Sequence, residues 1–287
     1  MKKFDYVRPR NMDEAIAALR ANDNSFVLAG GTDLLVGLKT NSVRPQCLID
    51  LKGIPNINSI EYNDGFKIGA LATVRDIEAS SRIREKLPAL CAAAATLGSI
   101  QIRNRATIGG NLCHGSPAAD MAAILLAMNG EVKIVSPDGE KNVTLNRFFA
   151  GPGSTVLAKD EVLAEIIIPK EIESYQGLYL KHGPRKAMDI GIVNIAILLN
   201  ADFKSHRCNR ISIALGAVAP TPIRAKKAEA LLEGQLLTTE RICEAAEKAA
   251  SEAKPISDFR ASAGYRRDLV KSLIIKGIQQ IIAHNAN

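Results

Sequence analysis

A polar break after residue 168 divides this sequence of 287 residues into two parts with different orders of secondary-structure patterns. The β-branched run Val162 to Ile168 predicts a strand, and Pro169 ends it because proline lacks the amide hydrogen that a sheet ladder needs. The next segment, Lys170 to Tyr175, is polar and carries acidic and basic residues. We therefore expect one domain over residues 1–172 and a second over residues 173–287.

The first part mixes helix and strand patterns. Asn11 and Glu14 form a capping-box pattern ahead of a helix, and apolar runs at 25–29 and 47–51 predict strands. This predicts a small α/β subdomain over about residues 1–52. A second α/β subdomain, over residues 53–172, is expected to contain strands at 66–70, 131–136, 141–145 and 162–168, helices at 73–81, 88–97 and 118–128, and a loop around Gly109 and Gly110.

The second part has its strand patterns first and its helical patterns afterwards. The strands are expected at 177–181, 192–201 and 210–218, and the helices at 223–232, 240–253 and 265–283. This order is typical of an antiparallel sheet covered by helices on one face. The sequence thus predicts an α+β protein: two α/β subdomains followed by an antiparallel sheet with helices.

Charge and composition narrow the classes of function. The chain has 37 Lys and Arg against 30 Asp and Glu, a net charge of +7, but the basic residues lie in short scattered groups. With no tryptophan and 4% aromatic residues, platforms for base stacking are scarce, so nucleic-acid binding is disfavoured. The five cysteines and four histidines show no metal-ligand spacing, and we expect no metal site in this chain.

No targeting or membrane segment is expected. Charged residues interrupt the segment Met1 to Arg10 before an apolar stretch can form, so a signal peptide is disfavoured. The most apolar candidate span, Leu269 to Ile282, is broken by Lys271, Lys276 and two glutamines. We therefore expect a cytoplasmic protein.

The first segment that suggests a chemical role is Val27 to Leu35, an apolar strand that runs into Gly30, Gly31, Thr32 and Asp33 and then into a helix-like segment. Paired glycines let successive backbone amides point at a phosphate or pyrophosphate group. An ordinary tight turn explains the same pattern equally well. The segment is neither a GxGxxG fingerprint nor a Walker motif.

The second segment, Arg105 to Asp120, carries glycines at 109, 110 and 115. Gly110 and Gly115 have P-loop spacing, but Ser116 and Pro117 stand where Lys and Ser or Thr are required, so nucleoside triphosphate hydrolysis is disfavoured. Two glycine-bearing segments, each with a Thr and an Asp, fit an extended dinucleotide. Asp120 alone fits the first turn of a helix as well.

Together these segments resemble both FAD-binding signatures of the medium subunit of molybdenum hydroxylases, the family of xanthine dehydrogenase and carbon monoxide dehydrogenase. The run Lys181 to Ile190 resembles the family's loop beside the isoalloxazine ring, and Ala219 to Ala225 resembles its carboxy-terminal domain. The resemblance implies an FAD-binding fold of the p-cresol methylhydroxylase type followed by a carboxy-terminal domain. It implies cofactor-binding roles for Leu28, Ala29, Gly30, Gly31, Thr32, Asp33, Leu34, Thr107, Ile108, Gly109, Gly110, Asn111, Ser116 and Asp120, with Lys181, Asp189 and Ile190 nearer the ring.

The resemblance also implies partners. Molybdopterin and 2Fe-2S clusters are expected in a large and a small partner subunit, in a dimer of heterotrimers that passes electrons through FAD to NAD or another acceptor. A covalent flavin is not implied, although Cys113 and His114 keep it open. The chain lacks the cysteine-rich insert of the relative that reduces hydroxybenzoyl-coenzyme A. The alternatives are a self-sufficient FAD-dependent oxidase and, less favoured, a basic nucleic-acid-binding protein.

Overall fold

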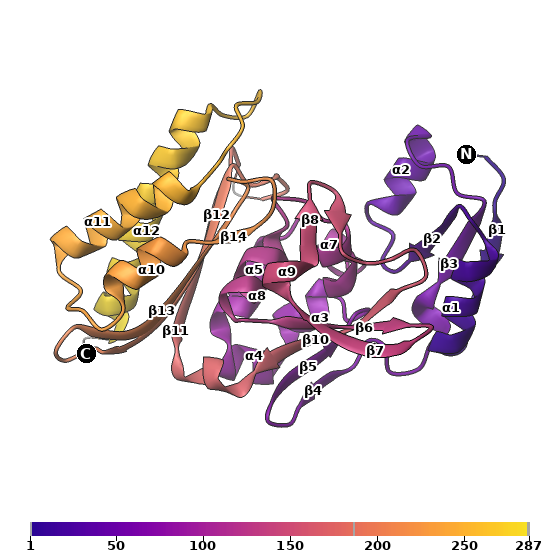
Figure 1. Cartoon of the computed structure of the whole chain (residues 1–287), viewed down its shortest axis with the longest axis horizontal. Helices are drawn as coiled ribbons and strands as arrows, with labels where there is room; N and C mark the ends of the chain where they lie inside the picture. The colour runs from indigo at the N-terminus through magenta and orange to yellow at the C-terminus, as the bar shows by residue number, and fades with distance from the viewer. Residues whose placement is uncertain (1, 186, 286–287) are drawn as a thin grey trace.

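The computed structural model describes residues 2–185 and 187–285. Its first subdomain is a three-stranded parallel sheet in the order β1-β3-β2, and it lies at one end of the molecule (Figure 1). The Asn11 cap is confirmed, because its side chain accepts from the Glu14 amide at 2.8 Å, but the capping box is not complete, since the Glu14 side chain accepts from the amide of Arg10 at 2.7 Å and not from that of Asn11. The elements are β1 (Asp5–Val7), α1 (Met12–Ala21), β2 (Ser25–Leu28), α2 (Leu34–Thr40), β3 (Cys47–Asp50) and η1 (Leu51–Gly53).

The second subdomain combines an antiparallel sheet with seven short helices. Its five strands have the order β4-β5-β10-β6-β7, which leaves β7 at one edge. The strands are β4 (Ile60–Tyr62), β5 (Gly65–Gly69), β6 (Glu131–Ser136), β7 (Gly139–Thr144) and β10 (Val162–Pro169). The helices are α3 (Val74–Ala79), α4 (Ser81–Lys86), α5 (Pro88–Thr96), α6 (Ile100–Arg103), α7 (Ile108–Cys113) and α8 (Asp120–Ala127), and α9 (Leu145–Phe148), β8 (Phe149–Gly151) and β9 (Ser154–Thr155) complete this part.

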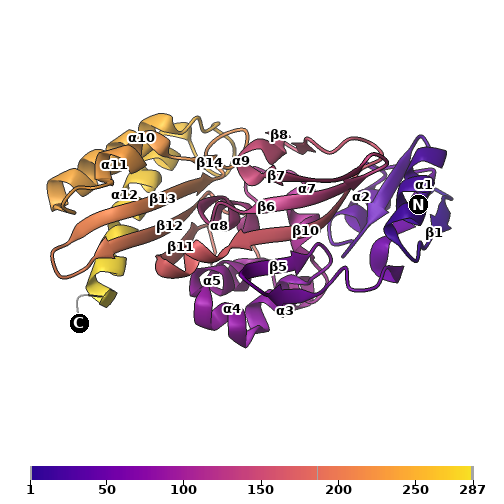
Figure 2. The same ribbon diagram turned by 60° about the horizontal axis from the view of Figure 1, so that its bottom comes forward.

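The last part is a four-stranded antiparallel sheet in the order β11-β12-β13-β14. Helices α10 to α12 cover one face of this sheet. Helices α5 and α8, which belong to the second subdomain, pack against its strands (Figure 2). The elements are η2 (Lys170–Ser174), β11 (Gln176–His182), β12 (Val193–Asp202), β13 (Arg207–Gly216), β14 (Ile223–Arg224), α10 (Lys226–Leu232), α11 (Thr239–Glu252) and α12 (Ala263–Asn285).

Both faces of this sheet are buried, which the expectation of helices on one face did not include. Along β12, Ile195 and Ile197 belong to the core under α10 to α12, whereas Ala196 and Leu198 belong to the core of the second subdomain. A strand buried on both faces is apolar without alternation, as β12 is. The carboxy-terminal sheet is thus fixed against the helix that begins at Asp120.

Several helix and strand predictions need correction, and the short elements β1, β4, α6, α9, β8 and β9 have no counterpart among the predicted ones. Residues 108–113, expected as a loop, form helix α7. Residues 73–81, expected as one helix, form two helices that are divided at the cap residue Ser80. Ile223–Arg224 pairs with β13 as strand β14, so the helix expected from residue 223 begins only at Lys226. Residues 170–174, expected only as a polar break, form the 3-10 turn η2. Among the described residues, no helix is long and apolar enough to span a membrane.

Candidate functional site

The first glycine segment connects β2 to α2 and leaves its backbone donors free. The amides of residues 30–33 donate no hydrogen bond to any residue that the structure describes. Gly31 has a φ of +78°, a left-handed conformation that favours glycine and lets neighbouring amides face one side. The Lys52 ammonium group lies beside this segment, since it donates to the carbonyl oxygen of Ala29 at 3.0 Å, and the Asp50 carboxylate pairs with it at 2.6 Å. Free backbone amides in this arrangement suit an anion such as a pyrophosphate.

The second glycine segment uses its amides differently. Thr107 caps α7, and its Oγ1 accepts from the Gly110 amide at 3.1 Å. The amides of Ile108 and Gly109 donate to the carbonyl oxygens of Ala72 and Ala70 at 3.0 and 2.9 Å. The side chain of Ile108 is buried in the core. The start of α7 is therefore bound to the second subdomain, and the partly exposed residues Gly110 and Asn111 face outward from it.

The two glycine segments fit against each other. A Cβ atom on Gly30 would collide with the carbonyl oxygen of Arg105, so the backbones meet there without space for a side chain. A Cβ atom on Gly110 would lie 3.9 Å from that of Ala29. The structure thus brings together two segments that lie about eighty residues apart in the sequence.

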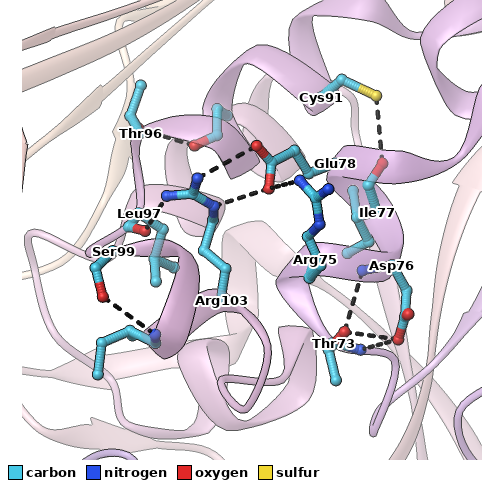
Figure 3. Close-up of polar contacts among 12 residues, drawn as sticks. Thr73, Arg75, Asp76, Ile77, Glu78, Cys91, Thr96, Leu97, Ser99 and Arg103 are labelled. Atoms are coloured by element: carbon cyan, nitrogen blue, oxygen red, sulfur yellow. Dashed lines mark hydrogen bonds and ion pairs between the residues drawn. The ribbon is translucent and has the colours of Figure 1, made fainter.

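An ion pair between Arg103 and Glu78 holds the chain directly before the second glycine segment (Figure 3). Arg103 donates to Glu78 at 2.8 and 3.3 Å and to the carbonyl oxygen of Leu97 at 3.0 Å, and it is 8% exposed. Burial alone would raise the pKa of Glu78, but its hydrogen bonds with Arg103 and Arg75 hold it below the usual value. Two residues further on, Arg105 presents the carbonyl oxygen that contacts Gly30.

We expect Gly30→Ala to weaken FAD binding by roughly tenfold or more, because a displaced backbone moves the free amides by enough to lose a charge-assisted hydrogen bond. Gly151→Ala is the control, since a Cβ atom there meets nothing within 4 Å. Fluorescence titration of FAD into each apoprotein measures the difference. Equal affinities for the two variants would show that the contact between the segments is irrelevant to binding.

A second group of expected residues forms a buried charge cluster. The Lys181 ammonium group on β11 lies 3.0 Å from an oxygen of Asp120 at the start of α8 and 3.8 Å from one of Asp189. Lys181 also donates to the carbonyl oxygen of Thr96 at 3.2 Å, and the Tyr179 hydroxyl donates to Asp120 at 3.2 Å. The three charged side chains are between 5% and 11% exposed.

Burial dominates the electrostatics of this cluster. It raises the pKa of Asp120, although Lys181 opposes the shift. Burial and the neighbouring Asp120 raise the pKa of Tyr179 well above its ordinary value, so this hydroxyl stays protonated. The cluster carries two carboxyl groups against one ammonium group. It can therefore hold a fixed, partly negative potential beside a bound ligand.

The remaining expected residues lie around these two groups. Asn111 connects them, because its Oδ1 accepts from the Met121 amide at 3.3 Å. Asp33 and Leu34 lie at the start of α2, and the Ser116 hydroxyl accepts from the Ala118 amide at 3.3 Å. Ile190 is 55% exposed, whereas the neighbouring Asp189 joins the charge cluster. Burial raises the pKa of the Cys113 thiol to about 12, which disfavours the thiolate that covalent flavin attachment needs.

Comparison with known proteins decides the family. The model described as the FAD binding domain in molybdopterin dehydrogenase matches residues 2–171, and the CO dehydrogenase flavoprotein C-terminal domain matches residues 179–281. The chain belongs to the family of FAD-binding medium subunits of molybdenum hydroxylases. As such it is an oxidoreductase component, and both the resemblance and the fold class inferred from the sequence are confirmed.

Relatives of this medium subunit match it almost from end to end. It is 32% identical to the glyceraldehyde dehydrogenase medium chain of Sulfolobus acidocaldarius, over 97% of this chain and 98% of the relative. It is 33% identical to the xanthine dehydrogenase FAD-binding subunit of Escherichia coli O157:H7, over 97% and 96%. The solved carbon monoxide dehydrogenase from Hydrogenophaga pseudoflava superposes with a TM-score of 0.92 at 32% identity, covering 96% of both chains.

Sequence reasoning missed two residues of the site. Tyr179 precedes Lys181 by two positions on β11, so strand alternation places both side chains on one face and gave a usable signal. Lys52 follows the buried strand β3, and nothing in its local sequence relates it to Ala29. Only the parallel pairing of β2 with β3 brings the two together.

Proposed function

We propose that the two glycine segments and the charge cluster together hold one FAD molecule. The observation that carries the proposal is the set of four unpartnered amides at residues 30–33, packed against the segment that begins α7. These amides and Lys52 would bind the pyrophosphate, and Asn111 and Asp120 would lie along the ribityl chain. Lys181 and Asp189 would lie nearer the ring. FAD supplies the redox chemistry when bound, and the protein provides orientation and potential.

We also propose that this subunit works in a larger complex. Its relatives include medium chains of glyceraldehyde and carbon monoxide dehydrogenases. One solved relative, the carbon monoxide dehydrogenase from Hydrogenophaga pseudoflava, is described as lacking the Mo-pyranopterin moiety of the molybdenum cofactor. By analogy, a molybdopterin-containing large subunit and a 2Fe-2S small subunit would deliver electrons through FAD to NAD or another acceptor. The assembly would be a dimer of heterotrimers, and this chain would divide near residue 172 into an FAD-binding and a carboxy-terminal domain.

The experiment is purification of the complex with an affinity tag on this chain, followed by an absorbance spectrum and mass identification of the co-purifying chains. A flavin spectrum with molybdopterin and iron–sulfur partners supports the proposal. Flavin without partners, together with substrate oxidation by the chain alone, would instead establish the self-sufficient oxidase. Shift of a nucleic acid at physiological salt without flavin would contradict both.

Asp189→Asn should raise the flavin reduction potential by an amount on the order of tens of millivolts, while FAD stays bound. A carboxylate opposes accumulation of negative charge on the reduced flavin, and its removal relieves that effect. Asp189 lies 3.8 Å from the Lys181 ammonium group and accepts from the backbone amide of Arg185, so it is held inside the protein and is not paired with a side chain in solvent.

Transfer to the final acceptor should slow with the same substitution. Asp138→Asn, in an exposed hairpin turn, is the matched control, and its potential should be unchanged. Lys186→Ala is also expected to leave the potential unchanged, but Lys186 lies outside the described residues. A redox titration in which Asp189→Asn and the wild type have the same potential would remove Asp189 from the flavin environment.

A further inference from the structure

A cavity of about 620 Å³ lies where the second subdomain meets the carboxy-terminal sheet. None of the residues expected to hold FAD lines it, so it is a separate site. Its wall is formed by the end of α8, the edge strand β7, helix α9 and the connection from β14 to α10. The residues involved are Leu126, Asn129, Gly130, Asn142, Val143, Thr144, Asn146, Arg147, Arg224 and Lys226.

The wall of this cavity is positively charged. It contains three cationic side chains, Arg147, Arg224 and Lys226, and no acidic residue. One carboxylate, the buried Glu229, lies behind Arg224 at 2.6 Å and Lys226 at 3.2 Å. Since one carboxylate cannot neutralise three cations, a positive excess faces the cavity.

Arg224 is held in place by the protein on every side. Besides Glu229, it donates to the Ser212 hydroxyl at 2.7 Å, to the Asn129 side chain at 2.7 Å and to the carbonyl oxygen of Leu126 at 3.3 Å. The last contact offsets the negative end of α8, which would otherwise repel an anion. Arg224 therefore forms a rigid charged back wall that joins the two parts of the chain.

The other polar groups of the wall are free to bind a ligand. Within the described residues, the side chains of Asn142, Thr144, Asn146 and Arg147 make no hydrogen bond and no ion pair. A guanidinium group with amide and hydroxyl donors around it is the donor set that recognises phosphate oxygens. The cavity also has apolar surface from Leu126 and Val143, where an attached organic group would lie.

We propose that this cavity binds a phosphate-type anion and so bridges the FAD-binding part and the carboxy-terminal part. Arg147 and Lys226 contact the anion, and Arg224 supplies fixed positive charge behind it. The ligand chemistry is a phosphate group, carried either by free phosphate or by a phosphate monoester such as a nucleotide.

The test is calorimetric titration of inorganic phosphate, and separately of AMP, into the full chain saturated with FAD, so that the glycine segments are already occupied. Saturable binding is expected, with affinity reduced roughly tenfold in Arg147→Ala and in Lys226→Ala. Lys227→Ala is the matched control, because Lys227 is the neighbouring exposed lysine and does not line the cavity. Tighter binding of AMP than of phosphate would identify a monoester as the ligand, and equal binding would identify the free anion.

Absence of saturable binding to the FAD-loaded wild type would overturn the proposal. Equal loss of affinity in Lys226→Ala and Lys227→Ala would also overturn it, since it would show only a general effect of net charge. Neither result would bear on FAD binding, which the flavin spectrum reports independently.

Discussion

Gly31→Val should leave a folded protein that retains little FAD, with affinity reduced by roughly tenfold to a hundredfold. Gly31 has a φ of +78°, and a β-branched residue is strained in that conformation. The new Cβ atom would also lie 3.1 to 3.2 Å from the side chains of Leu28 and Leu35. Rotation of the loop backbone would relieve the strained φ and the close contacts. The same rotation would turn the free amides of residues 30–33 away from the pyrophosphate.

Gly110→Val should have the same effect by another route. A Cβ atom at this position lies 2.7 Å from Thr107 Oγ1, the atom that caps α7, so the valine displaces the cap and shifts the surface beside Ala29. Gly151→Val is the control in open space. The measurements are the flavin-to-protein ratio after gel filtration and a thermal melt by circular dichroism. Full flavin in both variants, with an unchanged melting temperature, would show that neither glycine approaches the pyrophosphate.

The two glycine segments also show what the sequence could predict. The pattern from Val27 to Leu35 correctly indicated a strand, a turn and a helical run, because each of these has a local signal. The pair at 109 and 110 was interpreted as a loop, since glycine disfavours helix. Tertiary contacts override that preference here: Thr107 caps the turn, and the amides at its start bond to residues 70 and 72.

Long-range relations within the site had no local signal. Asp120 and Lys181 are 61 residues apart, and their contact depends on how α8 packs against β12 and β13, which lie in the same sheet as β11. A charged residue in the first turn of a helix and a lysine on a strand are each ordinary in isolation. Only the resemblance to the medium-subunit family implied that Asp120 and Lys181 lie near the same cofactor. The hydrogen bonds of Tyr179 and of the Thr96 carbonyl oxygen became visible only in the folded structure.

Lys181→Met should lower the free energy of unfolding at neutral pH by about 3–5 kcal/mol, because it removes one partner of a buried ion pair and leaves the carboxylates uncompensated. The Lys181 side chain is 7% exposed, and it lies between Asp120 and Asp189. Lys271→Met is the matched control. Its lysine pairs with Glu247 at 2.9 Å on the surface, where loss of an ion pair has little effect.

The pH dependence of this loss follows from the raised pKa of Asp120. A carboxyl group whose pKa is higher in the folded than in the unfolded state binds its proton more tightly when folded, so its stabilising effect is complete at acidic pH and disappears as the pH rises through the folded-state value. Lys181 opposes the upward shift, and its removal moves this window to higher pH. The difference in stability between Lys181→Met and the wild type should therefore be small in acid and grow towards neutral pH.

Urea unfolding from about pH 5 to about pH 8 measures this dependence, with wild type and variant compared at each pH. The double variant Lys181→Met/Asp120→Asn should recover much of the lost stability and show a flatter pH profile, because the group that titrates is gone. A deficit in Lys181→Met that is the same at every pH, and that Asp120→Asn does not reduce, would mean that lost packing causes the instability. Lys181 would then act in this fold through its methylene groups and not as the counter-ion of Asp120.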